Sequence, residues 1–253
     1  MNRAFVVANQ KGGVGKSTCA VNLAYQVAQM GYKTCIIDAD PQGNATCGLG
    51  YIPEELEQTI YDLFLDDIST NIQASDIIVC TEYDNLSIMP ANISLADVEI
   101  ANYTGIELVI RYTIESISDH YDYIFIDTPP SLGKLTVSAL TGGTHLLIPI
   151  QCEYYALQGV RQLVETFQRV KRKLNRNLVI GGAFATMYDA RTKVAKRTVE
   201  LIQGYFKNRA FNTFIPRTVR ITESQEVGIP VQVYEPENPA SSAFVELAKE
   251  VIA

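Results

Sequence analysis

The sequence has few of the residues that build metal centres or disulfide frameworks. Among its 253 residues are five cysteines, none in a Cys-x-x-Cys pair, and only two histidines, His120 and His145. A structural zinc site needs about four such ligands at short spacings, so this scarcity argues against one. We expect the cysteines to be reduced residues in or near the core rather than partners in disulfides.

Long apolar runs are also absent. No stretch approaches the roughly 18 residues that a spanning helix needs, and the first apolar run starts too close to Met1 for a signal peptide. No repeat or low-complexity linker divides the chain, and 47% hydrophobic with 19% charged residues suits one sizeable core. We therefore expect a single cytoplasmic domain over residues 1–253, with no N-terminal helix-turn-helix extension and no stable membrane association.

A glycine-rich loop follows the first apolar run. The run covers residues 4–8 and is typical of a buried strand, and the loop reads Lys11-Gly12-Gly13-Val14-Gly15-Lys16-Ser17-Thr18. Its glycines allow successive backbone N–H groups to point at one anion, and the helix that begins near Lys16 adds its positive end. Lys16 is expected to reach the outer phosphates of a nucleotide, and Ser17 to ligate Mg²⁺. A glycine-rich turn without a ligand is the alternative, but it does not explain this order of elements.

The loop departs from the standard phosphate-loop pattern at its start. That pattern has a glycine six residues before its lysine, where this chain has Gln10, and a second lysine, Lys11, comes next. Lys11 lies on the outer limb of the loop, where the nucleotide of its own subunit does not need it. We therefore expect Lys11 to reach a phosphate that a facing subunit holds.

With these residues the chain resembles the deviant Walker A ATPases, a group that includes the ParA/Soj partition proteins, MinD and the nitrogenase iron protein. The ParA/Soj branch is the most similar of these. Further segments that resemble it are residues 149–157, 186–192, 215–220 and 243–251. The resemblance therefore extends over nearly the whole chain.

Two more apolar runs end in carboxylates. Residues 33–37 precede Asp38 and Asp40, and residues 123–126 precede Asp127. The resemblance assigns Asp40 to orienting the attacking water, Asp38 to the network around Mg²⁺, and Asp127 to holding Mg²⁺ through a water or through Ser17. A hard cation and a water both need oxygen acceptors beside the γ-phosphate. Taken alone, the Asp-x-Asp-Pro-x-Gly run is as consistent with a polar turn as with a binding site. Its position directly after a strand favours a ligand-binding site.

The resemblance also completes the nucleotide site. Pro129 and Pro130 turn the chain after the third apolar run into a loop able to sense the γ-phosphate. In ParA/Soj proteins the backbone around Met187 and Pro216 frames the adenine. The resemblance thus implies an ATPase with ATP and Mg²⁺ as cofactors, and its catalytic residues would be Lys11, Lys16 and Asp40.

Apolar runs and amphipathic stretches alternate along the chain. Strands are expected at residues 4–8, 33–37, 86–90, 123–127, 145–150, 178–185 and 211–215, and helices at about 16–30, 53–65, 106–117, 156–174 and 192–206, with a last helix from about 239. This alternation predicts an α/β domain with a mostly parallel twisted sheet and helices on both faces, the architecture of phosphate-loop NTPases.

Basic residues are scarce before residue 161 and concentrated after it. Residues 161–220 hold fourteen Lys/Arg and three Asp/Glu, whereas residues 1–160 hold six and nineteen, in a chain of net charge −7. This basic third indicates a localised surface for a polyanion, and the alternative is a set of solvated helix faces.

The resemblance places Arg220 on a DNA-binding surface, and Lys173, Lys196 and, more weakly, Lys249 are further candidates. The sequence departs from the family after Glu223. Relatives often continue with Ala-Pro-Ser-His-Gly-Lys, but residues 224–229 here read Ser-Gln-Glu-Val-Gly-Ile, which removes basic character.

Taken together, the resemblance implies a DNA-partition ATPase associated with the nucleoid. It would form a homodimer with ATP sandwiched between the subunits, bind double-stranded DNA without sequence preference, and hydrolyse ATP slowly until a ParB-like partner stimulates it. A MinD-like membrane ATPase would need a basic amphipathic helix after the fold, and an iron–sulfur carrier would need bridging cysteines that Cys47 and Cys152 do not supply. A relative that positions another cargo, such as a protein organelle, would share the same ATP site.

Overall fold

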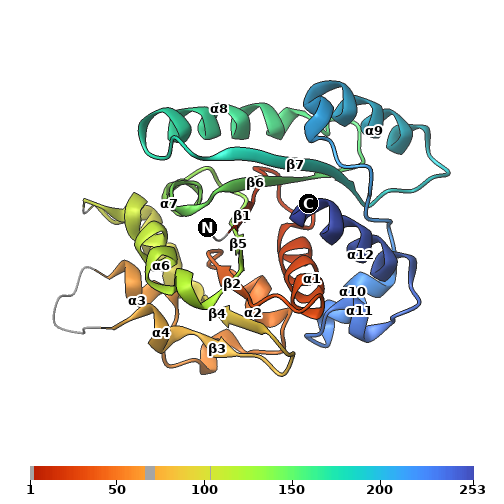
Figure 1. Ribbon diagram of the computed structural model, residues 1–253. Coiled ribbons are helices and arrows are strands. Elements are labelled where there is room, and N and C mark those ends of the chain that lie inside the picture. Colours follow the sequence, from red (N-terminus) through yellow and green to blue (C-terminus); the bar gives the residue numbers. More distant parts are fainter. Residues whose placement is uncertain (1–2, 66–71, 103) are drawn as a thin grey trace.

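A seven-stranded sheet forms the centre of the computed structural model, which describes residues 3–65, 72–102 and 104–253 (Figure 1). The strand order is β3-β4-β2-β5-β1-β6-β7, and every neighbouring pair is parallel except β3 with β4. The strands are β1 Arg3–Val7, β2 Thr34–Asp38, β3 Val79–Cys80, β4 Leu86–Met89, β5 Tyr123–Asp127, β6 His145–Gln151 and β7 Val179–Thr186.

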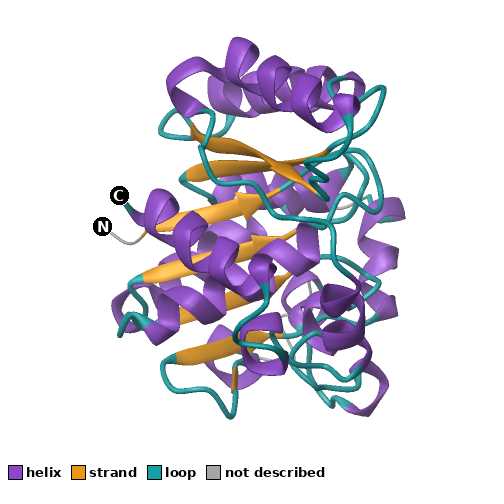
Figure 2. Ribbon diagram, turned by 90° about the vertical axis from the view of Figure 1, so that its right-hand side faces the viewer, coloured by secondary structure: helices purple, strands orange, loops and turns teal. Residues whose placement is uncertain are grey.

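Helices cover both faces of this sheet (Figure 2). The longer ones are α1 Lys16–Gln29, α6 Val109–Ile117, α7 Lys134–Gly142, α8 Gln158–Lys173, α9 Lys193–Phe206, α10 Val219–Glu226 and α12 Pro239–Ile252. Single turns are α2 Asn44–Cys47, α3 Ile60–Phe64, α4 Ala74–Ile77, α5 Asp97–Ile100 and α11 Val231–Tyr234, with 3₁₀ turns at Pro53–Glu55, Ile93–Ala96, Ile106–Leu108, Ser118–His120 and Lys207–Arg209. Of the helices described, none combines the length and apolarity that crossing a bilayer requires.

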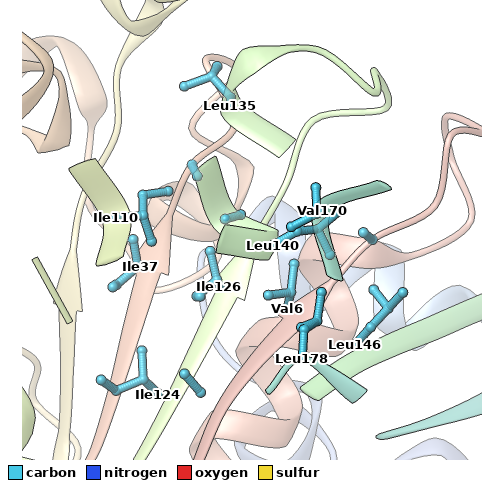
Figure 3. Close-up of a cluster of buried hydrophobic side chains, with 14 of the residues drawn as sticks. Val6, Ile37, Ile110, Ile124, Ile126, Leu135, Leu140, Leu146, Val170 and Leu178 are labelled. Carbon is cyan, nitrogen blue, oxygen red and sulfur yellow. The ribbon is translucent and has the colours of Figure 1, made fainter. Parts of the chain in front are cut away.

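Side chains along β1 alternate between the two faces, as a strand requires. Ala4 and Val6 belong to one cluster of buried apolar residues, and Phe5 and Val7 belong to another. The first cluster contains residues of α6, α7, α8 and α9, and Figure 3 shows part of it around Val6. The second contains residues of α1 and α12. The apolar faces of the longer helices are therefore buried in two layers, one on each face of the sheet.

The two ends of the described chain meet in the second layer. The Arg3 guanidinium donates a hydrogen bond to the carbonyl of Ile252 (2.8 Å), and α12 packs along α1. Arg3 begins β1, at the centre of the sheet. The C-terminal helix therefore stabilises the element from which the glycine-rich loop emerges.

The sheet and its helices confirm the predicted α/β architecture. Six of the seven predicted strands are present, but residues 211–215 form no strand. That segment follows the outer edge of β7 as extended chain, with single backbone hydrogen bonds from Phe211 N–H to Ala183 and from Ile215 N–H to Ala185 (both 2.9 Å). The Phe211 ring lies where a side chain on Gly182 would be, so the segment packs against β7 without pairing fully with it.

The helix predicted over residues 53–65 is also wrong, and several elements were missed, among them α7, α10 and β3. Leu56 has extended backbone (φ −86°, ψ 125°), which separates the 3₁₀ turn Pro53–Glu55 from α3. Helix α7 was not predicted, because its Ser, Thr and Gly content gave no clear helical pattern. The antiparallel strand β3 has two residues, too few for a period-two signal.

The carboxyl ends of the central strands meet at one edge of the sheet. The chain leaves β1 for β2 on one side, and it leaves β5 for β6 on the other. Parallel sheets bind ligands where the connections diverge in this way.

Candidate functional site

A cavity of about 480 Å³ lies at this edge. Its lining comes from three parts of the chain: residues 12–19 of the glycine-rich loop and α1; Asp40, Gln42, Asn44 and Pro130 from the loops after β2 and β5; and residues 186–187, 215–218, 221, 222, 225 and 244 from the last third of the chain. The predicted residues Gly12 to Thr18, Asp40, Met187 and Pro216 thus line one cavity.

The glycine-rich loop is built to present backbone N–H groups. Gly13 and Gly15 have positive φ angles of 72° and 90°, a conformation that other residues rarely adopt. Gly15 precedes α1 without a side-chain cap, so the first-turn N–H groups of α1 remain available to an anion. The Thr186 hydroxyl donates to the carbonyl of Val14 (2.8 Å), which ties the loop to the end of β7.

Lys16 is directed into the site and is only 6% exposed. Its ammonium donates to the Lys11 carbonyl at 3.4 Å, the long end of the hydrogen-bond range. Burial lowers the pKa of Lys16, and the charges of Asp127 and Asp40 act in the opposite direction. A buried cation with one weak contact is suited to a polyanionic ligand.

Asp38 and Asp127 lie side by side, because β2 and β5 pair in a register that matches these two residues. Asp38 is fully buried, and its oxygens accept from the Asp40 N–H (3.1 Å) and from the N–H and hydroxyl of Thr46 (2.9 and 2.8 Å). Burial raises the pKa of Asp38 to about 6. Since both oxygens are already bonded, the structure shows Asp38 positioning the loop of Asp40, and direct contact with Mg²⁺ stays a prediction.

Asp127 differs from Asp38 in having a free oxygen. Its Oδ1 accepts from the Thr128 N–H (3.0 Å), but its buried Oδ2 has no partner among the described residues. Burial and the neighbouring Asp38 raise the pKa of Asp127 well above its usual range, while the Ser17 hydroxyl beside it lowers that pKa. An unpaired buried carboxylate oxygen beside a hydroxyl fits a hard cation.

The described residues contain no group of three or more His, Cys, Asp or Glu able to hold a metal by themselves. Mg²⁺ in nucleotide sites is commonly held by one or two protein oxygens plus phosphates. Ser17 and Asp127 fit that arrangement, with the remaining ligands to come from a nucleotide and water.

Asp127→Asn is expected to stabilise the protein without nucleotide, although it removes the group expected to hold Mg²⁺. Because the pKa of Asp127 is raised in the folded protein, ionisation of this carboxyl destabilises the fold. The stability associated with its protonated form is present at low pH and is lost as pH rises. We expect the variant's melting temperature to exceed that of the wild type at pH 8. The difference should shrink as pH falls. A lower melting temperature at pH 8 would contradict this account of Asp127.

Asp40 is nearly buried and lines the cavity. Its Oδ1 accepts from the Gln42 N–H (3.0 Å), and no hydrogen bond to its Oδ2 occurs in the part of the chain that the structure describes. One fixed and one available carboxylate oxygen allow Asp40 to accept from a water in the cavity.

Lys11 lies at the outer rim rather than inside the cavity. Its ammonium forms an ion pair with Glu153 and donates to Gln151 Oε1 (3.3 Å), both at the end of β6. The side chain is 38% exposed. Lys11 therefore has a partner in its own subunit and would have to exchange that partner to bind a phosphate on another.

Two backbone segments from the last third of the chain also line the cavity. Met187 has a positive φ of 52°, which is uncommon for a residue with a side chain. Tyr188 and Pro216 form an isolated bridge beside it, with hydrogen bonds from Tyr188 N–H to Ile215 and from Arg217 N–H to Tyr188 (both 3.0 Å). The two predicted adenine-framing residues are thus brought together, and their contact with a base stays a prediction.

Sequence reasoning missed one wall of the cavity. Thr218, Ile221, Thr222 and Gln225, at helical spacing on and just before α10, all line it. They follow the glycine-rich loop by about 200 residues and form no motif. The available signal was the spacing of Thr218, Thr222 and Gln225, which would lie on one face of a helix.

The predicted DNA-contacting residues fall into two groups. Lys173 at the end of α8 and Lys196 on α9 are exposed, and neither forms an ion pair within the described chain. Lys249 pairs with Glu246 (2.7 Å). Helices α8 and α9 lie together on the β7 side of the molecule (Figure 1).

Of the four candidate DNA-contacting residues, Arg220 is the one whose charge is paired with two carboxylates. Its guanidinium pairs with Glu223 (2.7 Å) and Glu235 (2.9 Å). Arg220 lies on α10, and other residues of this helix line the cavity.

Comparisons with known proteins agree with this geometry. The AAA domain family matches residues 2–180. The chain is 43% identical to the sporulation initiation inhibitor protein Soj of Bacillus subtilis, over 100% of this chain and 99% of that protein. It is 41% identical to the chromosome-partitioning ATPase Soj of Treponema pallidum, over 100% and 98%.

Among solved structures, the chain is similar to cobyrinic acid a,c-diamide synthase of Mycobacterium smegmatis with bound ADP and magnesium. The TM-score is 0.85 at 30% identity, and the match covers 98% of this chain and 93% of that one.

Proposed function

Because the chain belongs to the AAA domain family and is similar over its whole length to the Soj chromosome-partitioning ATPases, we propose that it is a DNA-partition ATPase that binds and hydrolyses ATP with Mg²⁺. The observation that carries this proposal is the single cavity that joins the glycine-rich loop, Asp40 and the segments around Met187 and Pro216.

Each group of residues in the cavity has a separate role in this proposed reaction. The loop N–H groups and Lys16 would hold the phosphates, and Ser17 and Asp127 would hold Mg²⁺, which would neutralise phosphate charge. Asp40 would accept a proton from the attacking water through its available oxygen, while the Gln42 N–H fixes the other. Pro130 lines the same cavity, which supports a role for the loop after β5 near the γ-phosphate.

Dimerisation follows from the position of Lys11. Its ion pair with Glu153 holds the ammonium at the rim, on the edge of the sheet where the cavity lies. In an ATP-bound dimer, Lys11 exchanges Glu153 for a phosphate of the facing subunit. The exchange is favourable because a triphosphate carries more charge than one carboxylate.

Size-exclusion chromatography tests this proposal directly. The protein should elute as a dimer with ATP and Mg²⁺ and as a monomer with ADP. Measured ATP turnover under the same conditions should be slow. A monomer with both nucleotides would remove the central mechanism.

The dimer binds double-stranded DNA through the exposed cations of α8 and α9, without sequence preference. Phosphate contacts of this kind give affinity but read no bases. A ParB-like protein bound at a specific DNA site stimulates hydrolysis and so releases the dimer from the nucleoid.

Reversal of Lys173 and Lys196 to glutamate should weaken DNA binding strongly and leave ATP binding unchanged. Loss of two phosphate contacts per chain, four per dimer, is expected to reduce the magnitude of the slope of log K against log[salt] by about 3–4. Lys33→Glu is the matched control, because Lys33 is exposed just before β2, and three strands (β5, β1 and β6) separate β2 from β7. An unchanged electrophoretic shift of random-sequence duplex in the double variant would show that these cations merely solvate the surface.

A further inference from the structure

Thr218, Ile221, Thr222 and Gln225, on and just before α10, form a wall of the cavity that the glycine-rich loop, Met187 and Pro216 also line. In the proposed function the phosphates bind on the loop and the base binds near Met187 and Pro216. The sugar that joins them would then lie within reach of this wall. The inference that follows therefore rests on the proposed function.

Gln225 is the polar side chain of this wall that is fixed to the phosphate loop. Its Nε2 donates to the Thr18 hydroxyl (2.8 Å), across 207 positions of sequence. Thr18 is two residues after Lys16, at the start of α1, so the contact lies beside the phosphate end of the cavity.

The bond to Thr18 also orients the carboxamide. With Nε2 engaged as a donor, Oε1 remains as an acceptor, and no hydrogen bond to it occurs in the described residues. A ribose offers two hydroxyl donors on adjacent carbons, whereas a deoxyribose offers one. An oriented amide acceptor beside the sugar therefore distinguishes the two kinds of nucleotide.

We propose that Gln225 is a specificity-determining residue that accepts a hydrogen bond from one ribose hydroxyl and so favours a complete ribose over a sugar that lacks this hydroxyl.

Isothermal titration calorimetry with ADP, 2′-deoxy-ADP and 3′-deoxy-ADP, each with Mg²⁺, tests the proposal by measuring dissociation constants. Diphosphates are used because ATP is expected to cause dimerisation, which would add to the measured heat. At least one deoxy analogue should bind the wild type about three- to tenfold more weakly than ADP, the range that loss of one neutral hydrogen bond produces. In Gln225→Met the dissociation constants should become equal, mainly through weaker binding of ADP.

Gln203→Met is the matched control, because Gln203 is exposed on α9 and does not line the cavity. This variant should retain the wild-type preference. Equal wild-type affinity for all three nucleotides would overturn the inference, whatever the variants do, as would an unchanged preference in Gln225→Met. Failure of the wild type to bind any of the three would instead defeat the proposed function itself.

Discussion

Lys16→Ala is expected to abolish binding of ATP, with affinity falling by about 100-fold or more. Hydrogen bonds to charged groups contribute about 1.5–3 kcal/mol each, and this ammonium is positioned to make more than one to a triphosphate. The protein itself should still fold, since Lys16 makes a single 3.4 Å contact and its burial already disfavours the charge. In thermal melts the wild type should therefore gain stability with added ATP, and the variant should gain none.

Two other lysines serve as comparisons for this result. Lys33→Ala should behave as the wild type, because Lys33 lies at the far end of the sheet. Lys11→Ala should bind one ATP nearly normally but fail to dimerise, because its side chain lies at the rim, paired with Glu153. Equal loss of ATP affinity in Lys11→Ala and Lys16→Ala would exclude a cross-subunit role for Lys11.

Asp40→Ala should slow hydrolysis by about 100-fold or more while ATP and Mg²⁺ still bind. General-base catalysis contributes about 10²–10⁴-fold, and Asp40 lies in the cavity with one oxygen free of hydrogen bonds to the described chain. The trapped ATP complex should then persist as a dimer that retains DNA. Single-turnover hydrolysis and size-exclusion chromatography measure the two effects separately.

Asp119→Asn is a suitable control for this variant, since Asp119 is exposed at the amino end of β5. Wild-type turnover in Asp40→Ala would move the role of base to Asp38 or Glu153. The structure makes both poor substitutes, because Thr46 and the Asp40 N–H occupy the oxygens of Asp38, and Lys11 pairs with Glu153.

The parts of the site that sequence could predict are those in which a short motif forms the geometry. Gly13, Gly15 and Lys16 are neighbours in sequence, and the positive φ angles of the glycines are a local property. Asp127 could be predicted for a similar reason, because it ends an apolar strand. Its pairing in register with Asp38 then follows from the strand order.

The remaining parts depend on contacts between distant segments. Nothing near Gln225 indicates that its amide reaches Thr18, and nothing near Arg220 indicates that Glu235 pairs with it. The strand predicted at residues 211–215 fails for a related reason. Apolar alternation identifies extended chain, but only the neighbouring β7 and the Phe211 ring decide whether that chain joins the sheet.

The cavity also constrains when the protein becomes competent during its synthesis. The phosphate loop leaves the ribosome early, whereas residues 215–225, which also line the cavity, are synthesised much later. A nascent chain that ends before residue 215 carries Lys16 without these lining residues. We therefore expect nucleotide affinity to appear only after residues 215–225 have been synthesised.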